Sequence, residues 1–98
     1  YMENKKADKI TKDKIEKYRA LTSKALKIAG GSAVKGRESE AREILNMVSS
    51  YLSDSGYFEK NKDLVSAFAA LSYAHGWLDA GARLGIFDVK NNKLFTIR

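Results

Sequence analysis

Cysteine is absent from the 98 residues of this chain. Disulfide bonds, thiolate nucleophiles, cysteine-ligated zinc and iron–sulfur clusters are therefore all excluded. Histidine occurs once, at His75, so a metal site would need carboxylates for most of its ligands, and a helical zinc motif with two histidines is impossible. We expect neither a metal nor any other cofactor.

Proline is also missing, which removes the strongest helix breaker and leaves the seven glycines to mark turns. No stretch approaches the roughly 20 consecutive apolar residues of a membrane span, and the segment Met2–Asp13 is polar, unlike a signal peptide. These absences predict a cytoplasmic protein with no membrane partner. Because 44% of this short chain is hydrophobic, we expect one domain, residues 1–98, with a single core.

The net charge of +6 is concentrated in the first half of the chain, where residues 1–49 hold twelve basic and seven acidic side chains. Such a bias permits contact with nucleic acid, but a solvated lysine-rich helix face gives the same pattern. The lysines between Lys5 and Lys17 have only Tyr18 as a nearby aromatic, so the stacking pattern of single-strand binders is missing. Nucleic acid is an alternative partner that we do not favour.

Three segments repeat apolar residues at spacings of three and four, the pattern of one helix face. The predicted helices span 11–29, 39–60 and 63–84. Ser39 and Asp63 are suited to cap the second and third helices, whereas Gly30 and Gly85 end the first and third. Residues 30–38 then form a loop. The pattern predicts an all-α fold, an antiparallel three-helix bundle.

A short tail follows the third helix. Its two apolar runs, Ile86–Val89 and Leu94–Ile97, flank an Asn91–Asn92 pair, which predicts an extended or β-hairpin tail over residues 86–98. Two strands alone are marginal in water, so the tail must lie on the helices or on another subunit. At the other end of the chain, residues 1–10 are expected to be frayed.

The third helix is apolar nearly all round. Helical spacing divides its residues into three groups. The core side comprises Leu64, Phe68, Leu71, His75, Leu78 and Ala82, and the opposite apolar side comprises Ala69, Ala70, Tyr73, Trp77, Ala80 and Leu84. A narrow polar seam contains Ser72, Asp79 and Arg83. Two neighbouring helices cannot cover both apolar sides, so the tail or a second copy is expected to do so, and an exposed functional patch for an unknown protein partner is the remaining alternative.

Aromatic side chains are enriched at interface hot spots, and Tyr73 and Trp77 stand one turn apart on the side opposite the core. We therefore predict a homodimer formed by the third helix and the tail. The expected interface residues are Tyr73, Trp77, Leu84, Phe87 and Phe95.

His75, Asp79 and Arg83 form a possible polar site, because a carboxylate one turn after a histidine can orient the imidazole for general acid–base catalysis. A lone histidine between Phe68 and Leu78 is more often a hydrogen-bonded core residue, and an Asp79–Arg83 ion pair needs no ligand. We expect no catalytic residue and no enzyme, and a small enzyme built on these three residues is an alternative.

The stretches Tyr73–Ala80 and Arg83–Gly85 resemble an archaeal family known as domain of unknown function 357. The similarity extends from about Ala41 to Phe95, with a departure at Lys62, where family members commonly have glycine. The resemblance implies a three-helix bundle with a short C-terminal extension, and an archaeal source. It implies no activity, substrate or catalytic residue.

Together these observations predict an uncharacterised, non-enzymatic helical interaction or scaffold module that self-associates. The alternatives are a protein that binds nucleic acid or a nucleotide through the basic first helix, and the small enzyme centred on His75.

Overall fold

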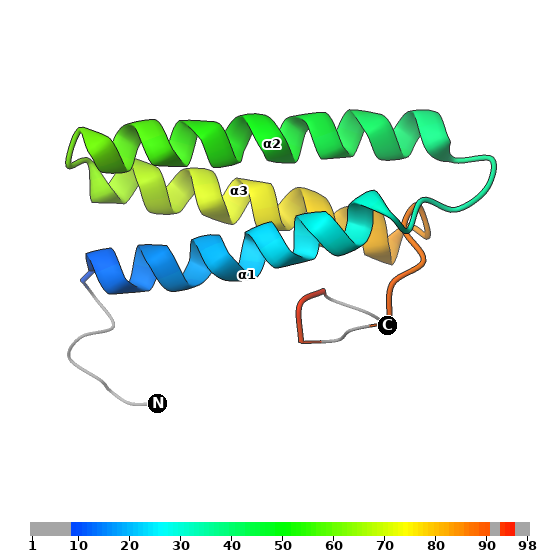
Figure 1. The fold of residues 1–98 in the computed structure, drawn as a ribbon, viewed down its shortest axis with the longest axis horizontal. Coiled ribbons are helices and arrows are strands. Elements are labelled where there is room, and N and C mark those ends of the chain that lie inside the picture. The colour runs from blue at the N-terminus through cyan, green and yellow to red at the C-terminus, as the bar shows by residue number, and fades with distance from the viewer. Residues whose placement is uncertain (1–8, 91–92, 96–98) are drawn as a thin grey trace.

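A computed structural model describes residues 9–90 and 93–95, and within these ranges the chain forms three α-helices and no β-strand. The helices are α1 (Lys12–Gly30), α2 (Glu38–Lys60) and α3 (Leu64–Arg83). Consecutive helices run in opposite directions, as Figure 1 shows, so the predicted all-α three-helix bundle is confirmed. In the described part of the chain no helix combines the length and the apolar character needed to cross a membrane.

Small residues dominate the inner side of α3. Its six buried residues are Ala67, Ala70, Leu71, Ala74, Leu78 and Gly81. Four of the six are alanine or glycine, and these four let α2 and α1 approach α3 closely. The larger apolar groups come mainly from the neighbouring elements, since Ile15, Ile44, Val48 and Phe87 are buried against this side. The core is therefore narrow, with bulk from α1, α2 and the tail meeting a slim face of α3.

Side-chain caps begin two of the three helices. Thr11 accepts a hydrogen bond from the Lys14 backbone N–H at 3.1 Å, and Asp63 accepts one from the Ser66 N–H at 3.1 Å. The hydrogen bonds from Ser66 hold the pKa of Asp63 below its ordinary value. At α2 the N-cap is Arg37, not the expected Ser39, and no side chain caps the helix.

The predicted β-hairpin is wrong for the described residues. The first apolar run of the tail pairs instead with the α1–α2 loop: Val34 N–H donates to Ile86 O at 2.9 Å and Asp88 N–H donates to Ser32 O at 2.8 Å. This contact forms one isolated antiparallel bridge, Ala33–Phe87. Because the loop occupies these backbone groups, they are not available to a second tail strand. Asn91, Asn92 and residues 96–98 of the predicted hairpin lie outside the described residues, as do residues 1–8 of the expected frayed terminus.

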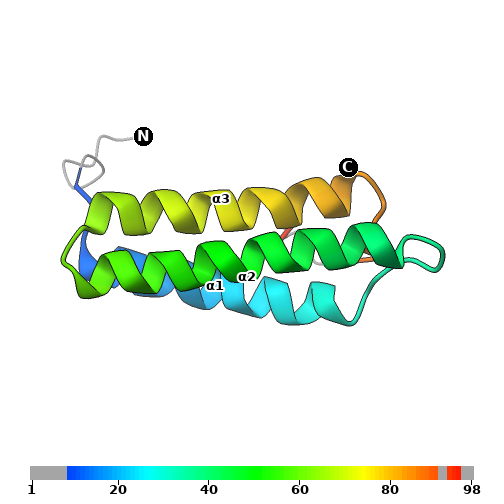
Figure 2. The same ribbon diagram turned by 90° about the horizontal axis from the view of Figure 1, so that it is seen from above.

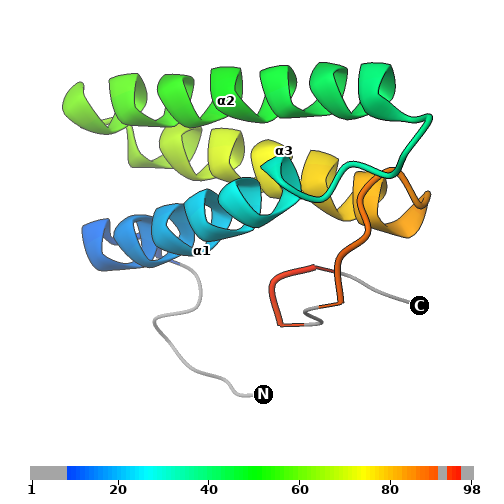
Figure 3. The same cartoon turned by 45° about the vertical axis from the view of Figure 1, so that its right-hand side comes forward.

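The tail folds back along the bundle on the side of α1, as Figures 1 and 3 show. Its apolar side chains complete the core, with Ile86, Phe87, Leu94 and Phe95 all buried. They pack beside Ala25 and Ala29 of α1 and residues of α2 and α3. The tail therefore covers its own subunit, on the α1 side of α3.

Gly81 is required where the tail crosses α3. A Cβ at this position would lie 2.5 Å from the Phe87 ring and 3.2 Å from Ile44 Cδ1. Gly81→Ala should therefore force the buried Phe87 ring to move and lower the free energy of unfolding by about 1–3 kcal/mol in urea denaturation.

The matched control for this substitution is Gly56→Ala in α2, where a Cβ would meet no atom within 4 Å. Alanine should raise the free energy of unfolding there by about 0.5–1 kcal/mol, because glycine loses more backbone entropy in a helix. Equal effects of the two substitutions would contradict the proposed contact between Gly81 and Phe87.

Candidate functional site

One side of α3 has no helix against it in the described part of the chain. Figure 2 shows α3 along an edge of the bundle, with α2 beside it. We call this side the outer face; it comprises Val65, Ala69, Ser72, Tyr73, Gly76, Trp77, Ala80 and Leu84, which are all exposed. None of these eight side chains carries a charge, but the exposed Arg83 stands seven residues after Gly76 and therefore lies on the same side of the helix.

The largest side chains of the outer face are only partly covered. Tyr73 is 62% exposed, Leu84 65%, Val65 69% and Trp77 39%. The Tyr73 ring lies against Tyr51 of α2, with the ring centroids 5.5 Å apart. Tyr73 is therefore an exposed aromatic group that a ring of α2 supports on one side.

Two shallow hollows adjoin Tyr73, and this residue contributes to the wall of both. One, of about 250 Å³, lies towards α2 and includes Tyr51, Phe58 and Ala69 in its wall. The other, of about 360 Å³, lies on α3 itself and is lined by Ser72, Tyr73, Gly76, Trp77 and Ala80. The second hollow exists because Ser72, Gly76 and Ala80 are small and stand between aromatic neighbours.

The five predicted interface residues separate into two groups. Tyr73, Trp77 and Leu84 lie on the outer face, whereas Phe87 and Phe95 lie in the core with 2% of each exposed. Ala70, which was assigned to the same side as Tyr73, is buried against the bundle. The small residue at Gly81 was a sequence signal for the placement of Phe87, since a glycine inside a helix leaves room for a neighbouring ring.

His75 links three parts of the fold. Its Nε2 is 2.7 Å from the carbonyl oxygen of Leu94 in the tail, and its Nδ1 is 3.0 Å from the Thr22 hydroxyl of α1. A carbonyl oxygen can only accept, so Nε2 carries the proton and donates it. In the neutral ring Nδ1 then accepts from the Thr22 hydroxyl. Both ring nitrogens are therefore occupied by partners within the protein.

The other two members of the expected polar site lie towards the surface. Asp79 Oδ1 is 3.9 Å from His75 Nε2, and both side chains are partly buried. Arg83 is exposed in the last turn of α3. Within the described ranges no group of three or more histidine, aspartate or glutamate residues could hold a metal ion. The structure thus places the histidine and the carboxylate near each other within α3, and the bond from His75 to Leu94 O joins the tail to this helix.

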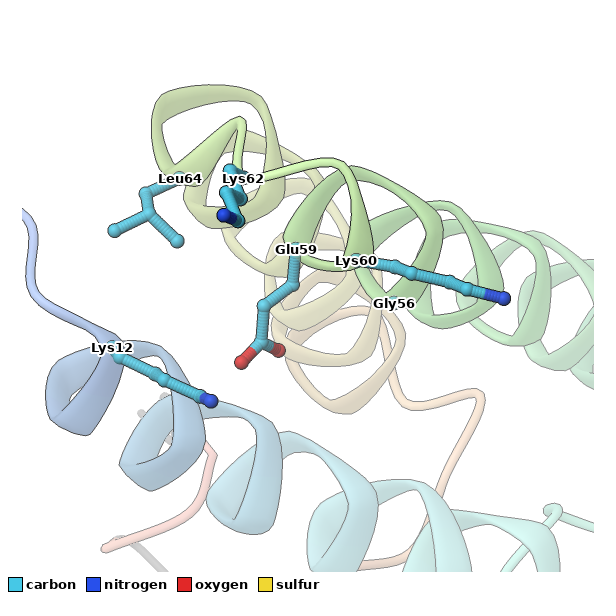
Figure 4. A pocket seen from close by; sticks show the side chains of 6 residues that line it. All are labelled: Lys12, Gly56, Glu59, Lys60, Lys62 and Leu64. Carbon is cyan, nitrogen blue, oxygen red and sulfur yellow. The ribbon is translucent and has the colours of Figure 1, made fainter.

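A second surface lies between the start of α1 and the α2–α3 turn, where a cavity of about 650 Å³ is lined by Lys12, Gly56, Glu59, Lys60, Lys62 and Leu64. Figure 4 shows Lys12 and Lys62 on either side of Glu59, while Lys60 extends away along α2. Glu59 is ion-paired with Arg19, which also donates a hydrogen bond to the Ser55 hydroxyl at 3.1 Å. In the described part of the chain none of the three lysines has an ion-pair partner.

Thr22→Val should weaken the link that His75 makes between α1, α3 and the tail. Valine has the same shape as threonine, but it removes the hydroxyl that donates to His75 Nδ1 and leaves this nitrogen without its partner. The expected loss in the free energy of unfolding is about 1–2 kcal/mol in urea denaturation. Ser72→Ala, which removes an exposed hydrogen bond to Phe68 O, is the control and should change stability by less than about 0.5 kcal/mol. An unchanged stability of Thr22→Val would contradict a stabilising role for this bond.

Comparison with known proteins adds the family. No curated protein and no solved structure matches the chain. A family model described as "Protein of unknown function (DUF357)" matches residues 9–87, which include α1, α2, α3 and the Gly81–Phe87 contact. With most of its length covered by this match, the chain belongs to the DUF357 family of proteins of unknown function.

Proposed function

We propose that this protein is a non-enzymatic helical interaction module that self-associates through the outer face of α3. The observation that carries the proposal is the pair Tyr73 and Trp77, exposed one turn apart on a side of α3 that the described tail leaves uncovered. Seven large apolar side chains are exposed among the described residues, and four of them, Val65, Tyr73, Trp77 and Leu84, lie along α3 or at its C-cap.

Exposed aromatic groups in one contiguous strip favour a binding surface over a solvated one. Each aromatic side chain can bury about 150–250 Å² in a contact. Contiguous apolar patches of this kind are uncommon on monomers and mark interaction sites. The Tyr51 ring already supports Tyr73 on one side, which reduces the side-chain entropy that Tyr73 would lose when a partner covers it.

A second copy is the occupant we propose, because Tyr73 and Trp77 carry no charge although the chain has a net charge of +6. The charged residue on the same side, Arg83, stands in the last turn of α3, so two copies can cover these two rings without burying Arg83. A two-fold axis also presents the same patch on both subunits, so the aromatic groups of each copy would be covered by one contact. Since the remaining repulsion is long-range, salt should strengthen the association.

The non-enzymatic part of the proposal is supported by His75. Catalysis by this residue would require a ring nitrogen that can reach a substrate, and both nitrogens are already bonded, to Thr22 and to Leu94 O. Asp79 adds a carboxylate at 3.9 Å on the same side as the tail. The hydrogen bonds of His75 hold α1, α3 and the tail together, and this role accounts for the histidine without catalysis.

The test is the mass of the protein in solution, measured by light scattering after gel filtration and by sedimentation equilibrium. The wild-type chain should be a dimer, and Trp77→Glu should be a monomer with unchanged helix content, because a buried unpaired carboxylate would oppose association. Tyr57→Glu is the matched control, since Tyr57 is 65% exposed but lies outside both hollows beside Tyr73. The proposal fails if the wild type is monomeric at every concentration, or if both variants dissociate equally.

A second candidate function is the binding of a phosphate-bearing ligand, either nucleic acid or a nucleotide. The observation that favours it is the cavity beside Lys12 and Lys62, two ammonium groups without ion-pair partners among the described residues. The carboxylate between them, Glu59, is balanced by Arg19. This arrangement leaves a positive potential at the opening of the cavity.

For this candidate we expect a mobility shift of labelled single-stranded RNA or DNA at low salt, weakening as salt increases. Lys12→Glu combined with Lys62→Glu should abolish the shift. The control combines Lys24→Glu with Lys27→Glu, which changes the net charge by the same amount at two α1 positions outside the cavity. This control should retain part of the mobility shift. Competition by a free nucleotide would identify the smaller ligand, and the absence of any shift or nucleotide binding at low salt would rule the candidate out.

A further inference from the structure

We infer that the hollow between α2 and α3 binds a cationic side chain, a lysine or an arginine presented by a partner protein. The wall of this hollow includes Tyr51, Asp54 and Phe58 of α2 and Ser66, Ala69 and Tyr73 of α3. We call it the aromatic hollow. The inference goes beyond self-association and does not depend on whether two copies meet along α3.

The aromatic hollow is built from matching positions on two antiparallel helices. Its residues follow one another at spacings of three and four on each helix, so each set lies on one helix face. α2 and α3 run side by side (Figure 2), and the Tyr51 and Tyr73 rings meet with their planes inclined by 33°. Phe58 stands about 10 Å further along α2 than Tyr51. The small Ala69 lies between Ser66 and Tyr73 on α3 and leaves space there.

Charge is almost absent around the aromatic hollow. With His75 neutral, residues 44–58 and 64–78 hold one charged side chain, Asp54, although 31% of the whole chain is charged. Asp54 is exposed, and within the described ranges its carboxylate has no ion pair and no hydrogen bond. One carboxylate beside three aromatic rings is therefore available to a ligand.

Rings and a carboxylate together favour a cation. The face of an aromatic ring attracts an ammonium or guanidinium group that lies within about 6 Å of the ring centroid. The methylene stem of a lysine or arginine can pack on the rings and on Ala69 while the charged end stays near Asp54. In the described part of the chain the hydroxyl groups of Tyr51 and Tyr73 also have no hydrogen-bond partner, so further acceptors are present. An anionic group would be repelled by Asp54.

The positive groups nearest the aromatic hollow are offset or face another side. Ser66 lies in the first turn of α3, where the helix dipole disfavours a cation, but the Asp63 carboxylate accepts a hydrogen bond from the Ser66 N–H and offsets this effect. Lys60 and Lys62 line the cavity that faces Lys12 of α1. The local charge at Asp54 is therefore negative although the net charge of the chain is +6.

The size and position of the hollow indicate a protein side chain as the ligand. Its volume of about 250 Å³ is below the roughly 300–1,000 Å³ of pockets that enclose small molecules. It therefore suits one side chain of a larger partner. Tyr73 also lines the neighbouring hollow with Trp77, so a protein surface that inserts a side chain beside Asp54 can cover the adjacent apolar residues as well.

The first experiment titrates the ¹⁵N-labelled full chain with blocked tripeptides that have lysine, arginine, norleucine or glutamate at the centre. The lysine and arginine peptides should shift the backbone amide signals of Tyr51, Asp54 and Tyr73, with a Kd in the millimolar range. Norleucine has the same four-carbon stem as lysine without the ammonium group, and its Kd should be about threefold higher or more. The glutamate peptide should cause no shift.

The second experiment repeats the lysine titration on paired variants, whose folding is checked by circular dichroism. Asp54→Asn should raise the Kd about twofold to fivefold, whereas Glu43→Gln, an exposed α2 acid in the wall of a different hollow, should not. Tyr73→Leu should also raise the Kd about twofold to fivefold. Its control is Trp77→Leu, which removes a ring of the neighbouring hollow only.

Trp77→Leu also separates this inference from self-association, because it removes a ring of the proposed dimer contact. Binding by Trp77→Leu but not by a dimeric wild type would show that the dimer covers the aromatic hollow, and the inference would stand. A monomeric wild type that binds the lysine peptide would overturn self-association alone. Three results would overturn the inference: norleucine binding as tightly as lysine, an Asp54→Asn Kd equal to that of Glu43→Gln, or no lysine binding by either the wild type or Trp77→Leu.

Discussion

The contact between Phe87 and Gly81 determines how the tail is placed, and through it which side of α3 is left open. The ring occupies the space that a Cβ at position 81 would take, and Ile44 of α2 closes the same site. Gly81 also accepts the backbone hydrogen bonds of Ile86 and Phe87 through its carbonyl oxygen. Because the chain enters the bundle here, the described tail runs beside α1. It does not turn towards Tyr73 and Trp77.

The same placement explains how the single histidine obtains its hydrogen-bond partners. Once Phe87 is seated, Leu94 and Phe95 reach the core, and the Leu94 carbonyl meets His75 Nε2. Thr22, fully buried on α1, accounts for the other nitrogen. The half-buried imidazole of His75 would be costly beside the core without hydrogen-bond partners, and here α1 and the tail each supply one. His75 thus joins segments that are distant in sequence, and its hydrogen bonds stabilise the fold.

The helices could be predicted from sequence because their signals are local. Asp63 caps α3 through a residue only three positions away, and the spacing of apolar residues in α1 and α2 reflects the faces that become buried. The tail could not be predicted in the same way. Its partner is the loop around Val34, more than fifty residues earlier, and an Asn91–Asn92 pair gives no information about that contact. Of the candidate interface, Tyr73, Trp77 and Leu84 followed from helical spacing, whereas the burial of Phe87 and Phe95 depended on the tertiary position of Gly81.

The two candidate surfaces are on different sides of the bundle, and this affects how they could work together. α1 meets α3 through Phe68, whose ring lies against Tyr18, and through His75, so α1 occupies a different side of α3 from the outer face. The lysine cavity lies between α1 and the α2–α3 turn. Pairing two copies through their outer faces would therefore leave both cavities open and place two basic sites on one dimer. A long anionic ligand could then bind both sites at once, and its avidity would depend on the dimer contact.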